Sequence, residues 1–261
     1  MNADETFQPV ALVTGASRGI GRAAALALAG RGFDLALVDL STTAADMEIT
    51  RERAAGLGAR SEFIAADIGD LGAHARIVAA ACARSGAIDV LVNNAGISVA
   101  QRGDLLAVSP QSFDRVLGVN LRGTFFLTQA VARSMLETPA PDRPRSIVTV
   151  TSANAVIASP DRAEYCISKT ALSMMVKVFA LRLAESGIGC YEVRPGVIRT
   201  DMTRVAKDKY DRLIGAGLTP IARWGEPEDV GRAVACLAAG ELSFVTGDAL
   251  HVDGGLHIHK L

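Results

Sequence analysis

The chain has 261 residues, of which 49% are hydrophobic and 21% are charged, and its formal net charge is −1. This composition excludes a disordered or collagen-like chain, and the balanced charge provides no general basic surface for nucleic acid or an anionic membrane. The length fits one large α/β domain or two small ones.

Short runs rich in β-branched residues alternate along the chain with longer, Ala-rich segments of helical period. The strand-like runs are 10–14, 35–39, 62–66, 90–93, 147–151, 190–194 and 249–252, and the helix-like segments include 22–29, 73–83, 113–135 and 171–184. This alternation predicts a doubly wound parallel sheet of about seven strands with helices on both faces. We expect residues 1–261 to form one α/β domain with a Rossmann fold.

Boundary signals support this organisation. Ser109-Pro110 predicts a helix start with proline at the first helical position, and Glu226 begins an acidic stretch typical of another. The Pro-rich stretch 137–144 predicts a surface loop rather than a domain linker. Residues 201–223 mix charges, glycines and a methionine and are expected to form a mobile lid over the substrate.

The cysteines and the first residues indicate the compartment. Four cysteines are widely scattered and form no C-x-x-C pair, so free thiols are expected. The N-terminal sequence has neither the basic nor the apolar region of a secretory signal, and no apolar run is long enough to cross a bilayer. We therefore expect a soluble, cytoplasmic protein.

A glycine-rich turn follows the first predicted strand. Thr14 to Gly21 read TGASRGIG, with glycines spaced G-x-x-x-G-x-G. Such a turn lets a pyrophosphate approach the main chain at the start of a helix, whose amide groups and dipole favour an anion. A tight turn without a ligand is the alternative.

The second predicted strand ends in Asp39, eighteen residues after Gly21. A carboxylate there accepts hydrogen bonds from both adenosine ribose hydroxyls and repels the extra phosphate of NADP. Arg18 could instead pair with that phosphate. We predict NAD as the preferred cofactor, with NADP as the alternative.

Later motifs, in this order, resemble the short-chain dehydrogenase/reductase family. They are TGASRGIG, Asp67 after the third strand, NNAG at 93–96, Asn120, Ser152, Tyr165-x-x-x-Lys169 and Pro195-Gly196 with Thr200. The resemblance covers nearly the whole chain and is greatest to 3-oxoacyl-(acyl-carrier-protein) reductases and the related sugar and polyol dehydrogenases. It implies a dinucleotide-dependent oxidoreductase that is a homotetramer.

The catalytic residues expected from this resemblance are Asn120, Ser152, Tyr165 and Lys169. Tyr165 fits the acid that protonates a ketone oxygen, and Lys169 lies one helical turn away, where its ammonium is expected to lower the tyrosine pKa. Ser152 follows a strand and can hold the substrate oxygen. The resemblance assigns Asn120 to a water that relays protons; a helix asparagine with only structural contacts is the alternative.

The resemblance also implies the cofactor-binding set. Asp67 and Ile68 would contact adenine, Lys169 the nicotinamide ribose, and the residues from Pro195 onward the nicotinamide amide. The expected set is Gly15, Ser17, Arg18, Gly19, Ile20, Gly21, Asp39, Asp67, Ile68, Asn94, Ala95, Gly96, Tyr165, Lys169, Pro195, Gly196, Ile198 and Thr200.

Two further features have no assigned role. On a strand, His257 and His259 would share a face, with His251 nearby, but no carboxylate or cysteine completes a metal site. We therefore expect no metal here, and a frayed tail or a subunit contact instead. Trp224 is expected either to wall the substrate cleft or to fill a gap.

The sequence thus predicts an oxidoreductase that interconverts a secondary alcohol and a ketone, similar to a 3-oxoacyl reductase. The alternatives are an NAD-dependent sugar, polyol or hydroxy-acid dehydrogenase, or a non-catalytic dinucleotide-sensing regulatory protein. Its expected partners are a small-molecule substrate and copies of itself, with neither nucleic acid nor membrane.

Overall fold

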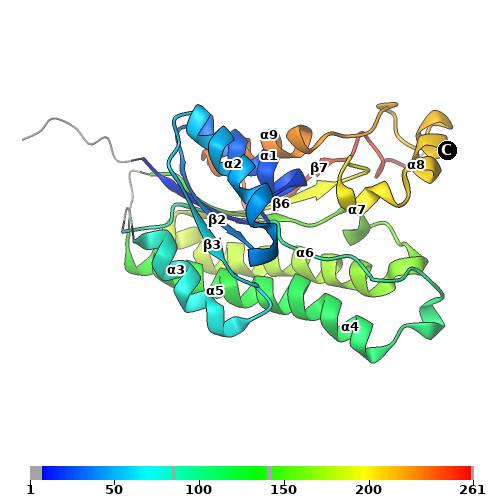
Figure 1. Ribbon diagram of the computed structural model, residues 1–261, viewed down its shortest axis with the longest axis horizontal. Helices are drawn as coiled ribbons and strands as arrows, with labels where there is room; N and C mark the ends of the chain where they lie inside the picture. Colours follow the sequence, from blue (N-terminus) through cyan, green and yellow to red (C-terminus); the bar gives the residue numbers. More distant parts are fainter. Residues whose placement is uncertain (1–7, 84–85, 140–142, 260–261) are drawn as a thin grey trace, which may run out of the picture.

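The structure is a computed structural model that describes residues 8–83, 86–139 and 143–259. Its strands are β1 (Val10–Thr14), β2 (Asp34–Asp39), β3 (Ser61–Ala65), β4 (Val90–Asn93), β5 (Arg145–Val150), β6 (Ile188–Pro195) and β7 (Ala249–Val252). Its α-helices are α1 (Gly19–Ala29), α2 (Ala44–Gly56), α3 (His74–Cys82), α4 (Pro110–Leu117), α5 (Thr124–Glu137), α6 (Ala163–Leu183), α7 (Asp201–Arg204), α8 (Lys207–Gly215) and α9 (Pro227–Ala238). Figure 1 shows the strands between two layers of helices.

The described strands form one parallel sheet of seven strands in the order β3-β2-β1-β4-β5-β6-β7. The predicted doubly wound sheet is therefore confirmed. The strand order reverses between β1 and β4, which pair in register with Leu12 beside Leu91. Parallel α/β sheets bind ligands beyond the carboxyl ends of their strands at such a point.

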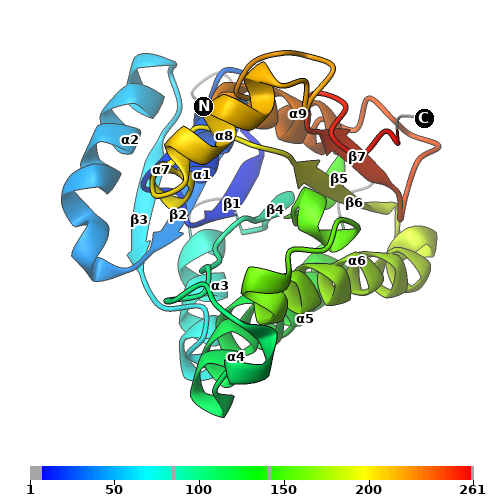
Figure 2. The same cartoon turned by 90° about the vertical axis from the view of Figure 1, so that its right-hand side faces the viewer.

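Each face of the sheet has its own apolar core. One core packs α1 and α9 against the sheet, and the other packs α3, α5 and α6 against the opposite face. Figure 2 shows these two helical layers on either side of the strands. Alternate strand residues enter opposite cores: Leu12 lies in the second and Val13 in the first, and both are fully buried. This two-sided burial explains why the strand sequences are apolar without alternation.

The helix predicted over 113–135 is confirmed as an unbroken helical run, but it is not α-helical throughout. A π-helical segment, Gly118–Gly123, separates α4 from α5. A Cβ atom on Gly123 would meet the Ile68 carbonyl oxygen at 2.5 Å, so glycine allows the helix to approach the loop after β3. Interruptions of this kind are frequent at functional sites. Helix α2 was absent from the predicted segments.

Both predicted helix starts are confirmed. The Ser109 hydroxyl accepts a hydrogen bond from the Ser112 amide, with Pro110 at the first helical position. Glu226 forms a reciprocal cap with Asp229 at the start of α9. The predicted loop 137–144 lies partly outside the described residues, as does most of the N-terminal stretch examined for a signal. None of the helices that the structure describes is both long and apolar enough to cross a membrane.

The segment expected to act as a lid contains α7 and α8. Trp224 anchors it: the indole nitrogen donates a hydrogen bond to Asp211 at 2.7 Å, and the ring packs edge-on against Tyr210. Trp224 belongs to a small apolar cluster with Val197 and Ile214. Trp224 therefore holds α8 in place. Of the two roles expected for it, it fills a gap and does not line the cleft described below.

Candidate active site

A cleft of about 810 Å³ lies at the carboxyl edge of the sheet, beside the point where the strand order reverses. Every residue in the expected cofactor-binding set lines this one cleft, and Ser152 lines it as well. The residues come from most of the length of the chain, between Gly15 and Thr200. Of the expected catalytic residues, only Asn120 is not part of its wall.

The glycine turn has a backbone that other residues would disturb. Gly15 has φ +65°, in the left-handed region, and a Cβ atom on Gly21 would clash with the Gly15 carbonyl oxygen. The Asn94 amide donates hydrogen bonds to the carbonyl oxygens of Thr14 and Gly15, at 3.0 and 3.1 Å. Asn94 therefore fixes the turn from the end of β4. A cradle of small residues with the first amides of α1 fits a pyrophosphate.

Asp39 lies beside the glycine turn, at the end of β2. Its two carboxylate oxygens accept hydrogen bonds from the Ser17 amide at 3.0 Å and the Leu40 amide at 2.8 Å. Arg18 pairs instead with Asp201 of α7, at 3.3 Å, and its side chain is 58% exposed. Asp67, the other acid of this region, accepts from the Gly69 amide and is exposed. This part of the cleft therefore presents a fixed carboxylate, with the nearby arginine already paired.

Thr14 organises the backbone between the two halves of the cleft. Its hydroxyl oxygen accepts hydrogen bonds from the amides of Asn94 and Ala95, both at 3.0 Å, and donates to the Val92 carbonyl oxygen. A Cβ atom on Gly96 would approach Asn120 Oδ1 and Lys169 Nζ at 3.2 and 3.6 Å. Small residues after β4 thus allow close packing at the strand reversal.

Tyr165 is 7% exposed and lies near the start of α6. Burial raises its pKa, and neither the hydrogen bond with Ser152 nor the charge of Arg162 is enough to reverse that effect. The expectation of a lowered tyrosine pKa is therefore wrong in its net direction, because burial outweighs the nearby charges in this arrangement of residues. The Lys169 ammonium lies 5.7 Å from the centre of the tyrosine ring, and the Arg162 guanidinium lies 5.2 Å from it.

Arg162 was not anticipated as a site residue. It lines the cleft and donates hydrogen bonds to Asn154 and Ser159, at 2.6 and 3.2 Å. It ends the short 3₁₀ turn that precedes α6, and its position three residues before Tyr165 is the sequence signal that could have indicated it. It brings positive charge directly to the phenol.

Lys169 is 4% exposed, and its ammonium donates a hydrogen bond to the Val150 carbonyl oxygen at 3.1 Å. Burial lowers its pKa to about 8, opposed by the negative charge of Glu192. Glu192, also missed from the sequence, is a buried carboxylate on β6. It accepts hydrogen bonds from Thr151, Ser173 and Arg194, at 2.6, 2.7 and 2.7 Å.

Asn120 is fully buried in the π-helical segment. Its side chain exchanges two hydrogen bonds with the Ile97 backbone, accepting at 2.8 Å and donating at 3.0 Å, and it also donates to Ser168. Ser168 in turn donates to the Tyr165 carbonyl oxygen at 2.7 Å. These contacts fit a structural role, which was the alternative to holding a water. Through them Asn120 connects the loop after β4 to α6, the helix that carries Tyr165.

The loop after β6 forms the remaining wall. Pro195, Gly196, Ile198 and Thr200 line it, and the Thr200 side chain forms a reciprocal cap with Thr203 at the start of α7. A Cβ atom on Gly196 would collide with the Asp253 backbone at 2.6 Å, so this loop lies directly against the residues that follow β7.

The expectation for the C-terminal histidines is wrong on two counts. His257 lies in a turn after β7 and not on a strand, so it shares no strand face with His259. A carboxylate does join the group, because Asp253 lies between His251 and His257.

The chain was compared with known proteins. Residues 15–257 match the family described as Enoyl-(Acyl carrier protein) reductase. The 3-oxoacyl-(acyl-carrier-protein) reductase FabG of Staphylococcus aureus is 34% identical over 95% of this chain and 98% of its own. L-rhamnose 1-dehydrogenase (NAD(P)(+)) of Azotobacter vinelandii is 35% identical over 95% of this chain and 96% of its own.

Among solved structures, a 3-oxoacyl-(acyl-carrier-protein) reductase of Brucella melitensis in complex with NAD has a TM-score of 0.94. It is 50% identical to this chain, and the match covers 97% of this chain and 99% of that one. The fold and the cleft define a dinucleotide-binding α/β protein. The chain belongs to the short-chain dehydrogenase/reductase family of oxidoreductases, and it resembles the 3-oxoacyl reductases within it.

Proposed function

We propose that this protein is an NAD-dependent oxidoreductase that interconverts a secondary alcohol and a ketone, with a 3-oxoacyl thioester as the first substrate class to test. The observation that carries the proposal is that Ser152, Tyr165 and Lys169 line the same cleft, so two hydroxyls and one ammonium are available there. A ketone oxygen needs such donors when it becomes an alkoxide.

In this proposal the bound nicotinamide supplies a hydride to the carbonyl carbon, or accepts one in the opposite direction. Ser152 donates a hydrogen bond to the carbonyl oxygen, and Tyr165 gives that oxygen its proton. The phenol is then reprotonated from solvent. The raised tyrosine pKa keeps the free enzyme in the protonated form, which is the form that reduction requires.

Lys169 has two parts in the proposal. Its buried ammonium stabilises negative charge on the phenolate after the proton leaves, because charges interact strongly in a site of low dielectric. Its ammonium, which lines the cleft, would also hold a ribose hydroxyl of the cofactor. Burial, and after it Cys166 and Tyr210, oppose the phenolate, whereas the positive charge of Arg162 stabilises it.

NAD is the proposed cofactor because of Asp39. A 2′-phosphate bound at the end of β2 would face its carboxylate, while Arg18 would have to leave Asp201 to compensate. Separating an exposed pair costs little, but burying a phosphate against a carboxylate costs several times as much. The NAD bound to the Brucella melitensis relative supports the same choice.

A second candidate function is favoured by Arg162. Its guanidinium lines the cleft beside the proton donor and could pair with a carboxylate on the substrate. A 2-hydroxy or 3-hydroxy acid, or a sugar acid, would supply that group. NAD preference suits such a dehydrogenase better than it suits a biosynthetic reductase.

One experiment separates these functions. Purified protein is assayed with NADH and NADPH against acetoacetyl thioesters and keto acids, and with NAD against hydroxy acids and sugars. Turnover of thioesters supports the first candidate, and turnover of acids that disappears in Arg162→Met supports the second. Tight dinucleotide binding without any turnover would contradict both and favour a dinucleotide sensor.

We also propose that the protein is a homotetramer paired through α5 and α6. These helices carry exposed apolar side chains, with Leu181 84% and Met174 59% exposed. Exposed apolar surface of this kind is typical of an interface. Light scattering coupled to size-exclusion chromatography measures the mass directly, and a monomer would contradict the proposal.

A further inference from the structure

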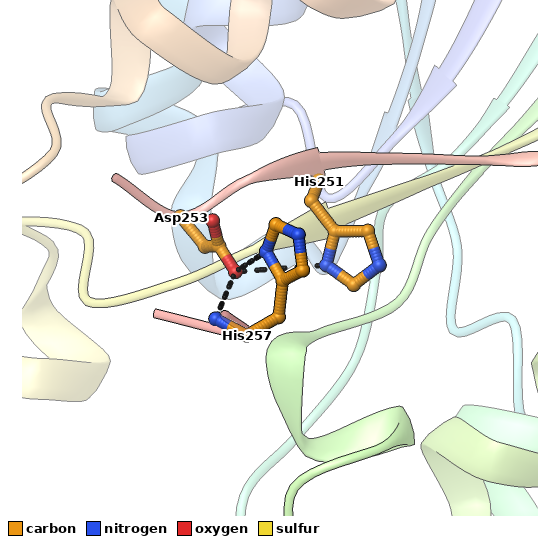
Figure 3. A group of neighbouring side chains, drawn as sticks. All are labelled: His251, Asp253 and His257. Carbon is orange, nitrogen blue, oxygen red and sulfur yellow. Dashed lines mark hydrogen bonds and ion pairs between the residues drawn. The ribbon is translucent and has the colours of Figure 1, made fainter. Parts of the chain in front are cut away.

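Three side chains converge where the chain leaves β7, the last strand of the sheet. His251 lies on β7, Asp253 just after it, and His257 one turn later (Figure 3). Asp253 Oδ2 lies 2.8 Å from His257 Nδ1 and 3.5 Å from His251 Nδ1. The two imidazole rings are stacked, with centroids 3.9 Å apart.

The carboxylate is held in place by the backbone. Asp253 Oδ1 accepts a hydrogen bond from the Gly255 amide at 2.9 Å, and Oδ2 accepts one from the His257 amide at 3.1 Å. Its side chain is 2% exposed. The carboxylate is therefore oriented before any ligand arrives.

The donor set suits a transition-metal dication. The nitrogen, nitrogen and oxygen atoms all lie within 4.8 Å of one another. Ligands about 2.1 Å from a tetrahedral ion lie roughly 3.4 Å apart, so small side-chain rotations bring these atoms to coordinating distance. Imidazole and carboxylate together favour zinc, nickel or copper over magnesium or calcium.

His251 provides an independent indication. Its Nδ1 atom is buried and forms no hydrogen bond, although the Asp253 carboxylate lies 3.5 Å away. A buried polar atom without a hydrogen bond normally costs stability. A metal ion would give that nitrogen a partner. His257 is 37% exposed, so an ion can enter from solvent, and water can complete the coordination.

Arg194 is the cation that faces this group. Its Nη1 lies 3.3 Å from His251 Nε2, which would carry the proton when Nδ1 binds a metal. Arg194 already donates to both oxygens of Glu192, at 2.7 and 3.0 Å, so its charge is balanced without His251. On the Arg194 side of the group, metal binding therefore requires only the loss of this long contact.

We propose that His251, Asp253 and His257 bind a first-row transition-metal dication, with Zn²⁺ as its representative. The site holds the turn after β7 against the loop after β6, because Asp253 packs directly on Gly196. The ion would join these two segments and touch none of the reacting groups. This inference does not depend on the proposed reaction.

Zn²⁺ binding to the untagged, chelator-treated protein tests the site by calorimetry, and Co²⁺ absorption reports the ligand geometry. We expect about one ion per chain, with affinity reduced by at least about tenfold in His257→Asn and in His251→Gln, since each loses a ligand. His259→Asn is the matched control: this exposed histidine lies in the same tail outside the group and should leave affinity unchanged.

Melting curves without metal establish that the variants fold. His257→Asn changes a partly exposed side chain, so it carries the test even if the His251 variant is unstable. Absence of stoichiometric binding to the parent protein would overturn the proposal. Equal loss of affinity in His259→Asn and His257→Asn would overturn it as well, because the metal would then be bound by the C-terminal histidines in general and not by this group of three residues.

Discussion

Replacing Lys169 with methionine should make the protein more stable near neutral pH while removing its activity. Lys169 is 4% exposed, and burial lowers its pKa from the ordinary 10.5 to about 8. A shift of this size means that the buried ammonium lowers the free energy of unfolding by about 3 kcal/mol at pH 7. Methionine retains the apolar length of the side chain but leaves the Val150 carbonyl oxygen without its donor, at a cost of about 1 kcal/mol. The expected net gain is about 2 kcal/mol.

The difference in stability between wild type and Lys169→Met should depend on pH. Because the folded-state pKa of Lys169 lies below the unfolded one, the unfolded chain binds more protons between about pH 8 and pH 10.5. Wild-type stability therefore rises through this window, whereas the variant lacks that contribution. The advantage of Lys169→Met should shrink from about 2 kcal/mol near pH 7 to about zero near pH 9.5.

Urea denaturation of both proteins across this range measures the difference directly. Lys177→Met is the matched control, because Lys177 is an exposed lysine on the same helix. Its substitution should produce no comparable stabilisation near neutral pH. A stability difference between wild type and Lys169→Met that stays constant from about pH 7 to pH 9.5 would refute the reasoning, because a buried ammonium must respond to pH in this range.

Three other substitutions test separate parts of the site. Asp39→Ser should raise the ratio of NADPH to NADH efficiency at least about tenfold, roughly 1.4 kcal/mol, in steady-state assays; an unchanged ratio would remove Asp39 from cofactor choice. Gly21→Ala should weaken NADH binding and lower stability by about 1–3 kcal/mol, because its Cβ would clash with Gly15. Fluorescence titration would show the weaker binding, and melting curves the lower stability. Glu192→Gln should destabilise the protein by about 3–5 kcal/mol in urea, since Arg194 would keep a poorly balanced charge; a loss below about 1 kcal/mol would contradict that role.

The sequence was most informative where one local rule determines the structure. Apolar strands without alternation predict a sheet buried on both faces, and the Ser109-Pro110 pair predicts a helix start. The glycines of the first turn and Asp39 were also predictable, because backbone approach and ribose recognition each require particular residue types at fixed places after a strand.

The features that could not be predicted from the sequence depend on contacts between distant segments. Glu192 meets Thr151 and Ser173 from different elements, and nothing near it in the sequence indicates a buried carboxylate under the active site. Asp253 joins His251 only because the chain turns after β7. The Tyr165 pKa was misjudged for a similar reason: burial depends on the whole fold, while the spacing to Lys169 shows only which side chains adjoin.

Proton transfer by Tyr165 is the central claim, and replacing this residue with phenylalanine tests it most directly. The substitution removes only the hydroxyl from a buried ring. Turnover with NADH and the best substrate of the panel should fall by about 10²–10⁴-fold, the usual contribution of a general acid. The NADH dissociation constant and the melting temperature should stay close to those of the parent protein. Turnover that persists at the parent rate, with NADH still bound, would contradict the account.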